Sequence, residues 1–96
     1  MEAKYMEVIS QKNLDKLVEM GFEITYKTNG FIRLINGKYN FRLTLFKPDP
    51  KDDDQGICMS IEDIDGVELK SGKARNVISN VTRWIENVIL KQLWYG

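Results

Sequence analysis

The sequence contains no histidine, and this absence removes several kinds of active site. Without an imidazole the chain cannot form a Ser-His or Cys-His nucleophilic dyad, and it lacks the usual proton shuttle near neutral pH. Zinc sites that depend on imidazole ligands are excluded as well. We therefore expect a protein that is not an enzyme and has no catalytic residues.

Cysteine and long apolar runs are also scarce. The single cysteine, Cys58, cannot form an internal disulfide, and we expect it to be an unreactive thiol on a polar strand face. No apolar run approaches the roughly 20 residues that span a bilayer, and the first ten residues do not resemble a secretory signal. These features predict a cytoplasmic protein with no membrane association.

Charge is plentiful but unevenly distributed. The chain has 14 acidic and 14 basic residues, for a formal net charge of zero. Segment 49–68 nevertheless holds eight carboxylates and a single base, Lys51, whereas the segments on both sides of it are net positive. An acidic arm on a basic body indicates recognition of a charged partner more readily than catalysis. The carboxylates that we expect to contact this partner are Asp49, Asp52, Asp53, Asp54, Glu62, Asp63 and Asp65.

The length and composition predict one domain, residues 1–96, with one modest core, because 43% of the 96 residues are hydrophobic. Residues 2–20 carry apolar side chains at helical spacing, which predicts an amphipathic helix that ends at Gly21. Ser10 offers an alternative start for this helix as its N-cap, with Ile9 and Leu14 packed across the first turn.

From Phe22 onward the apolar period changes to two, which indicates β-strands. A three-residue loop at 28–30 would pair Tyr26 with Ile32, and a two-residue turn at Asn36-Gly37 would pair Leu34 with Tyr39. Both pairings collect the apolar residues on one face. That face is predicted to carry Ile24, Tyr26, Ile32, Leu34, Tyr39, Phe41, Leu43 and Leu45, and the other face Thr25, Lys27, Arg33, Asn40, Arg42 and Thr44.

The second half of the chain begins with a loop, because two prolines, a glycine and four aspartates in segment 48–56 oppose a central strand. Residues 57–62 alternate as a fourth strand, and Asp65-Gly66 forms a turn into a candidate fifth strand at 67–69. A long helix is predicted from about Gly72 to Trp94, with Ser71 as its N-cap. The predicted fold class is α+β, a two-layer sandwich of an N-terminal helix, an antiparallel sheet of four or five strands and a C-terminal helix, with both helices on one sheet face.

Two segments that resemble ligand-binding motifs do not satisfy them. Segment 66–74 has one residue too many between its glycines for a phosphate-binding loop, and Ala74 stands where a hydroxyl must hold magnesium. An EF-hand alignment on Gly56 places Lys51 and Gln55 at ligand positions. We therefore expect no cofactor and no metal site.

The basic residues support alternative interactions. Lys27, Arg33 and Arg42 share the predicted polar sheet face, and Phe31 and Phe46 lie at its end, as in proteins that bind single-stranded nucleic acid. A second basic set is predicted at the start of the last helix, where it would attract an anion or the carboxylates of the acidic loop. That set consists of Lys70, Lys73 and Arg75.

The main functional hypothesis is a non-enzymatic protein-binding module that engages a basic surface of a partner through its acidic segment 49–68. Small inhibitors and adaptors of this kind are common in phage and mobile elements as antagonists of host defences. One alternative is single-stranded nucleic-acid binding through the basic sheet face. The other is a structural subunit of a homo-oligomer, in which Trp94 and Tyr95 anchor a second copy of the chain or another partner unless they pack against their own domain.

Overall fold

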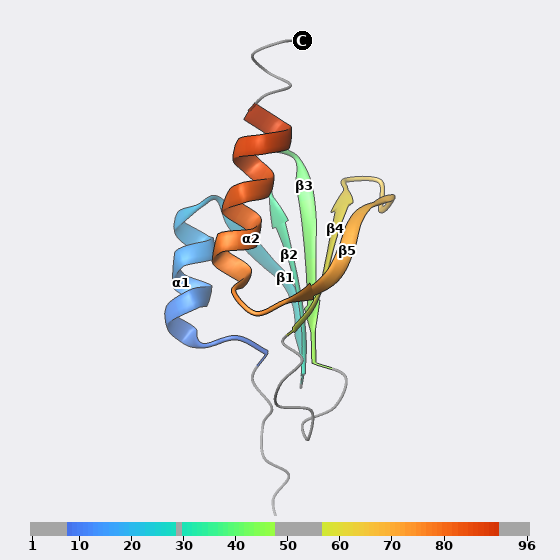
Figure 1. The fold of residues 1–96 in the computed structure, drawn as a ribbon. Coiled ribbons are helices and arrows are strands. Elements are labelled where there is room, and N and C mark those ends of the chain that lie inside the picture. The colour runs from blue at the N-terminus through green and yellow to red at the C-terminus, as the bar shows by residue number, and fades with distance from the viewer. Residues whose placement is uncertain (1–7, 29, 48–56, 91–96) are drawn as a thin grey trace, which may run out of the picture.

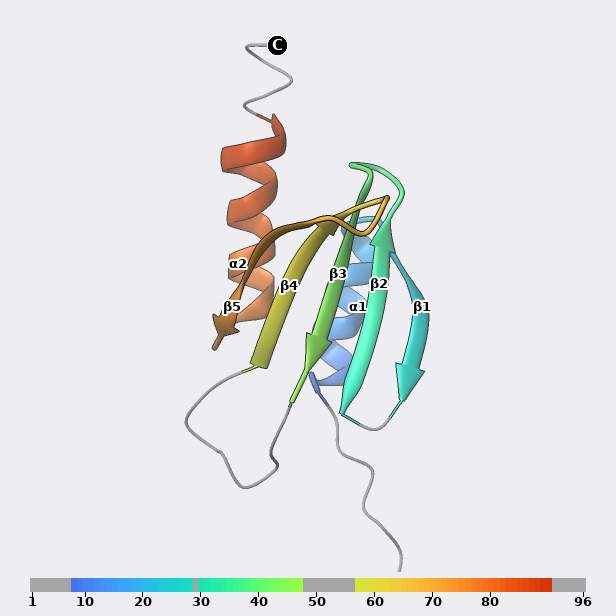
Figure 2. The same cartoon turned by 90° about the vertical axis from the view of Figure 1, so that its right-hand side faces the viewer.

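The computed structural model describes residues 8–28, 30–47 and 57–90, which form two layers (Figure 1). One layer is a five-stranded antiparallel sheet with its strands in chain order. The other layer consists of two helices on the same side of the sheet (Figure 1), and Figure 2 shows the sheet from the side that they leave uncovered. The elements are α1 (Gln11–Glu19), β1 (Phe22–Thr28), β2 (Phe31–Asn36), β3 (Phe41–Phe46), β4 (Ile57–Asp63), β5 (Glu68–Ala74), α2 (Val77–Trp84) and the π-helix η1 (Ile85–Ile89). The predicted α+β sandwich is confirmed.

The core lies between these layers and is built from the apolar alternation of the strands and the apolar stripes of the helices. Leu34, Leu43 and Ile61 are neighbours across β2, β3 and β4 and have no exposed surface. The remaining buried hydrophobic side chains are Ile9, Leu14, Leu17, Phe22, Ile32, Phe41, Leu45, Met59, Ala74, Val77, Val81 and Ile85. The opposite face of the sheet is hereafter called the outer face.

Helix α1 starts after Ser10, the residue that the sequence predicts as the alternative N-cap. The Ser10 side chain accepts a hydrogen bond from the Asn13 amide at 3.2 Å, and Ile9 and Leu14 are both buried. The prediction of one helix from residue 2 is wrong at residues 8–10, which are not helical; residues 1–7 lie outside the described part. The helix ends at Glu19, and Gly21 follows its Met20 C-cap, as the sequence predicts, with a φ of +102° that glycine adopts at little steric cost.

The β1–β2 hairpin differs from the predicted register after Ile24. Ile24 faces Leu34 as predicted, but Tyr26 faces Arg33 and Lys27 faces Ile32, because the connection is one residue shorter than expected. A β-bulge between Ile24 and Tyr26 absorbs the extra residue. Since a one-residue slip moves every following side chain to the other face, Tyr26 lies on the outer face and Lys27 on the helix side.

The β2–β3 connection, in contrast, is longer than predicted. Asn36 pairs with Phe41 and Leu34 with Leu43, so the turn spans residues 37–40 and Tyr39 is not a strand residue. The strands are displaced by an even number of residues relative to the prediction, which leaves the apolar face as expected. Asn36 itself is fully buried, and its side-chain oxygen accepts hydrogen bonds from the amides of Lys38 at 3.0 Å and Tyr39 at 2.9 Å.

The largest departure from the predicted boundaries is at β5 and α2. The fifth strand extends to Ala74, so Ser71 and Gly72 lie in a strand and the prediction that Ser71 caps the last helix is wrong. The cap is Asn76, whose side chain accepts a hydrogen bond from the Ser79 amide at 3.0 Å. The helix has eight α-helical and five π-helical residues, so its predicted length was an overstatement.

Replacing Asn76 by alanine is expected to lower the free energy of unfolding by about 1 kcal/mol, because the Ser79 amide then loses its acceptor at the first turn of α2. Urea unfolding followed by circular dichroism measures this loss. Asn87→Ala serves as a matched control, since Asn87 is exposed on η1. Equal stability of the two variants would contradict the assignment of the cap.

Candidate binding surfaces

The described part of the acidic segment is a closed hairpin. Asp63 holds the turn between β4 and β5, because its side-chain oxygen accepts hydrogen bonds from the amides of Asp65 and Val67, each at 2.9 Å. The Asp63 amide also donates a hydrogen bond to the Val67 carbonyl at 2.9 Å, and the Asp63 carbonyl accepts one from the Gly66 amide at 3.0 Å. Gly66 has a φ of +90°, in the left-handed region that favours glycine. The tip of the hairpin is therefore a fixed turn.

Three aliphatic side chains project from this hairpin into solvent. Ile64, Val67 and Leu69 are 54%, 59% and 49% exposed. Exposed aliphatic residues are common singly, whereas here three occur within six residues of one hairpin. Asp65 and Glu68 are exposed beside them. We call these five residues the hairpin tip.

The remaining two carboxylates of the described acidic segment are held by the fold. Glu62 is half-buried on the outer face and accepts a hydrogen bond from the Thr44 hydroxyl at 2.7 Å, and Asp63 has the turn amides described above. Arg42 lies directly opposite Glu62 in the β3–β4 register. Glu62 and Asp63 thus have structural partners, Glu68 accepts a longer hydrogen bond from the Ser60 hydroxyl at 3.4 Å, and the Asp65 side chain is exposed. The predicted partner-binding residues Asp49, Asp52, Asp53 and Asp54 lie outside the described residues.

The outer face of the sheet carries an aromatic cluster. Tyr26 and Phe31 pack edge to face with ring centroids 5.7 Å apart, and Phe46 lies directly opposite Phe31 in the β2–β3 register. The Arg33 guanidinium is 5.5 Å from the centroid of the Phe31 ring, within the range of a cation–π contact. The sequence pattern predicts Arg33, Phe31 and Phe46 on this face but not Tyr26. Taking Asn29-Gly30 as a two-residue turn would have revealed Tyr26.

Polar contacts connect the strands of this face. Arg33 donates from Nε to the Thr44 hydroxyl at 3.4 Å, and Thr44 donates to Glu62 at 2.7 Å. The chain of contacts runs from β2 through β3 to β4 and explains why Thr44, although polar, is only 8% exposed. Arg33 and Arg42 share this face, as predicted.

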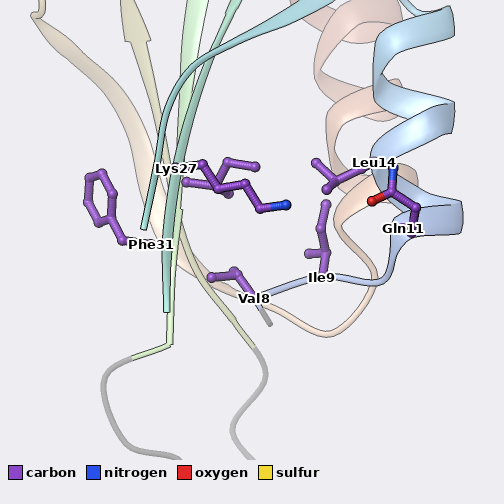
Figure 3. A pocket seen from close by; sticks show the side chains of 7 residues that line it. Val8, Ile9, Gln11, Leu14, Lys27 and Phe31 are labelled. Carbon is purple, nitrogen blue, oxygen red and sulfur yellow. The ribbon is translucent and has the colours of Figure 1, made fainter. Parts of the chain in front are cut away.

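Lys27 is not on the outer face, and the prediction that it joins Arg33 and Arg42 there is wrong. The bulge in β1 turns it to the helix side, where it lines a small cavity with Val8, Ile9 and Leu14. Figure 3 shows the Lys27 side chain directed toward α1, while Phe31 points to the opposite side of the sheet. The cavity, at about 10 Å³, has room for a single water molecule.

The predicted basic cluster at the start of the last helix is also not formed as expected. Lys70 and Lys73 lie on β5, where Lys70 faces Ile61 on the helix side and Lys73 faces Cys58 on the outer face. Arg75 follows the strand and precedes the Asn76 cap. These three side chains therefore do not converge at a helix N-terminus, because the fifth strand extends five residues further than predicted.

An apolar cleft lies beside the π-helix. It has a volume of about 290 Å³ and is lined by Met20, Tyr39, Ile85 and Leu90, with Lys38, Thr82 and Glu86 contributing polar groups. Its size is at the lower limit for small-molecule sites. Trp94 and Tyr95, the predicted anchor residues, lie outside the described residues.

The described residues contain neither a cluster of metal-ligating side chains nor a helix that could span a membrane. Among residues 8–28, 30–47 and 57–90, no three His, Cys, Asp or Glu side chains lie close enough together to hold a metal ion. None of the helices in these ranges is long and apolar enough to cross a bilayer. The Cys58 thiol is half-buried on the outer face, as the alternation predicted.

No protein-family model matches the chain. No significant match was found among curated proteins or among solved structures either.

Proposed function

We propose that this protein is a non-enzymatic binding module, an inhibitor or adaptor, that docks onto a basic surface of a partner protein through its acidic segment 49–68. The observation that carries the proposal is the hairpin tip. A fixed turn presents three exposed aliphatic side chains together with two exposed carboxylates. Burial of the apolar groups would supply affinity, and the charges would select a basic partner and accelerate the encounter.

The rigidity of the hairpin supports this proposal. Binding costs the conformational entropy of the groups that become ordered, so a preformed tip loses less free energy on association than a flexible arm. Asp63 supplies that order through its two amide contacts. The proposal therefore assigns Asp63 a positioning role and assigns contact with the partner to the residues around it.

The proposed partner is a nucleic-acid-handling protein of the cytoplasm. Carboxylates carry the same sign of charge as a phosphate backbone, so an acidic surface competes for the basic clefts that hold nucleic acid. The cytoplasmic assignment is motivated by the single cysteine of the sequence. A role against host defences, as in phage and mobile elements, belongs to this proposal.

The test is affinity capture from cytosol, followed by titration of the recovered partner against hairpin variants. Ile64→Ser/Val67→Ser/Leu69→Ser and Asp65→Asn/Glu68→Gln are each expected to weaken binding at least about tenfold, because they remove the apolar area and the exposed charge respectively. The charge variant should have its larger effect at about 50 mM salt and a smaller one at about 150 mM, since salt screens exposed charges.

Matched controls lie on α1, away from the hairpin. Val18 is 52% exposed and Glu19 is exposed, so Val18→Ser and Glu19→Gln remove the same chemistry elsewhere on the surface. They should change the affinity less than about twofold. A partner that binds the hairpin variants and the α1 variants equally well would rule out the proposal.

A further inference from the structure

The aromatic cluster of the outer face remains exposed although it lies on a rigid sheet. Tyr26 is 56% and Phe46 39% exposed, and Phe31 between them is half-buried. Register and ring contacts place the three residues side by side on β1, β2 and β3. Among the described elements, both helices cover the other face (Figure 2), so this cluster has no layer above it.

Acidic and basic residues occupy different parts of the outer face. The two cross-strand rows nearest the aromatic end contain bases, aromatic rings and hydroxyl groups but no carboxylate. They are Thr28, Phe31, Phe46, Cys58 and Lys73 in the first row and Tyr26, Arg33, Thr44, Ser60 and Ser71 in the second. The carboxylates Glu23, Glu62 and Glu68 all belong to the third row, which lies toward the β4–β5 turn. The aromatic half of the face therefore carries the bases Arg33 and Lys73, while the carboxylates of Glu62 and Glu68 reach its border, where they accept hydrogen bonds from the Thr44 and Ser60 hydroxyls.

Arg33 is held where a phosphate could approach it. Its Nε donates a hydrogen bond to the Thr44 hydroxyl, and its guanidinium lies over the Phe31 ring. These two contacts hold the side chain against the sheet. The terminal amino groups of Arg33 make no hydrogen bond to the described residues. A planar guanidinium beside an exposed ring can bind a phosphate oxygen while a base stacks on the aromatic group.

We propose that this half of the outer face binds single-stranded nucleic acid, with bases stacked on Tyr26 and Phe46 and phosphates near Arg33 and Lys73. An open, flat sheet with exposed aromatic rings suits unpaired bases, because every base offers a face for stacking. A protein partner is less well matched, since the aromatic rings are bordered by hydroxyl and basic groups and not by further aliphatic side chains. This site is distinct from the hairpin tip and goes beyond the proposed function.

The aspartates of segment 48–56 are expected to weaken the binding of nucleic acid to the outer face. Segment 48–56, with four aspartates, follows directly after Lys47 at the aromatic end of β3. Its carboxylates repel phosphates, so Asp52→Asn/Asp53→Asn/Asp54→Asn should tighten oligonucleotide binding. The same variant should weaken binding to the basic protein partner. The two proposals thus predict opposite effects of one variant, and the failure of one is distinguishable from the failure of the other.

The test uses fluorescence anisotropy with labelled oligo-dT and oligo-rU of about 12 nucleotides, a length within the range of single-strand site sizes, and a duplex of about the same length. The single strands should bind, more weakly as salt rises, and the duplex at least about tenfold more weakly. Tyr26→Ala and Phe46→Ala should each lower the affinity at least about fivefold, whereas Tyr26→Phe, which keeps the ring, should retain it.

Arg33→Gln should lower the affinity and reduce the slope of log affinity against log salt by about 0.7. Arg83→Gln is its matched control, since Arg83 is exposed on α2. Circular dichroism and urea unfolding check that each variant is folded. Absence of binding at about 50 mM salt, or equal binding by the Tyr26→Ala and wild-type proteins, would overturn the proposal. So would a protein ligand that is lost with Tyr26→Ala while no oligonucleotide binds.

Discussion

Replacing Leu43 by alanine is expected to destabilise the protein by about 3 to 4 kcal/mol. Leu43 has no exposed surface and sits on the central strand, with Leu34 and Ile61, also fully buried, directly beside it on the neighbouring strands. Truncation leaves a cavity that these strands cannot close without breaking their hydrogen-bonded register. Because a small domain has a free energy of unfolding of only about 5 to 15 kcal/mol, this loss is a large fraction of the total.

Leu69→Ala is the matched control, since it removes the same atoms from a leucine that is 49% exposed on an edge strand. We expect a change in stability within about 0.5 kcal/mol. Urea unfolding measures both variants. If the hairpin tip binds a partner, Leu69→Ala should lower the affinity for that partner without changing the free energy of unfolding. Leu43→Ala should lower the free energy of unfolding. Similar unfolding midpoints for the two variants would contradict the assignment of the core.

The apolar alternation of β2 and β3 could be predicted because one face of these strands is buried. Leu34, Leu43 and Leu45 lie in the core as expected, and the error in the Asn36-Gly37 turn did not disturb this because the shift was even. Because one face is buried, a register shift by an odd number of residues would move the apolar side chains into solvent and destabilise the fold. The apolar pattern therefore predicts which face of a strand is buried more reliably than it predicts which residues pair across two strands.

The register of β1 could not be predicted in the same way, because two local preferences compete there. A two-residue connection at Asn29-Gly30 favours one register, and burial of Phe22 requires the other. The bulge satisfies both, and no glycine marks its position in the sequence. Tyr26 and Lys27, which follow the bulge toward the turn, were consequently assigned to the wrong faces.

Strand β5 was predicted too short because it lacks apolar alternation. Its residues are exposed on both faces except Ala74, since it lies at the edge of the sheet. Lys, Ser and Gly in this strand resemble a loop when read from the sequence alone. That error moved the expected helix start toward Gly72 and placed Lys70, Lys73 and Arg75 on a helix.

Both edges of the sheet have features that oppose edge-to-edge pairing. β1 has a bulge and an inward-directed Lys27, and β5 has a bulge and two lysines. Such features are typical of edges that remain unpaired. A homo-oligomer built by joining sheet edges is therefore the least favoured of the alternative hypotheses, and any self-association would use another surface.

Replacing Asn36 by alanine is expected to destabilise the protein by about 2 to 4 kcal/mol, although the residue lies at the end of a strand. Its side chain connects three segments. Nδ2 donates to the Met20 carbonyl at the end of α1 at 3.2 Å, and Oδ1 accepts from the amides of Lys38 and Tyr39 in the β2–β3 turn. The side chain has no exposed surface, so water cannot replace these bonds without a rearrangement.

The size of the effect follows from what the substitution leaves behind. Alanine removes a donor and an acceptor, so one carbonyl and two amides lose their partners in a partly buried corner. Gly21 lies in the same corner, because a Cβ added there would come within 3.2 Å of the Lys38 Cβ and 3.4 Å of Asn36 Oδ1. Gly21→Ala should therefore also destabilise the fold, by about 1 to 2 kcal/mol, and its effect should not add to that of Asn36→Ala.

The control for Asn36 is a second asparagine in the same connection. Asn40 is exposed with a φ of +57°, a conformation that glycine adopts more easily, so Asn40→Gly should leave the stability within about 0.5 kcal/mol. Urea unfolding measures all of these variants, and a double-mutant cycle measures the coupling between Gly21 and Asn36. If Asn36→Ala and Asn40→Gly unfold at the same urea concentration, the buried side chain does not join α1 to the sheet. The β2–β3 turn would then be stabilised by its backbone conformation alone.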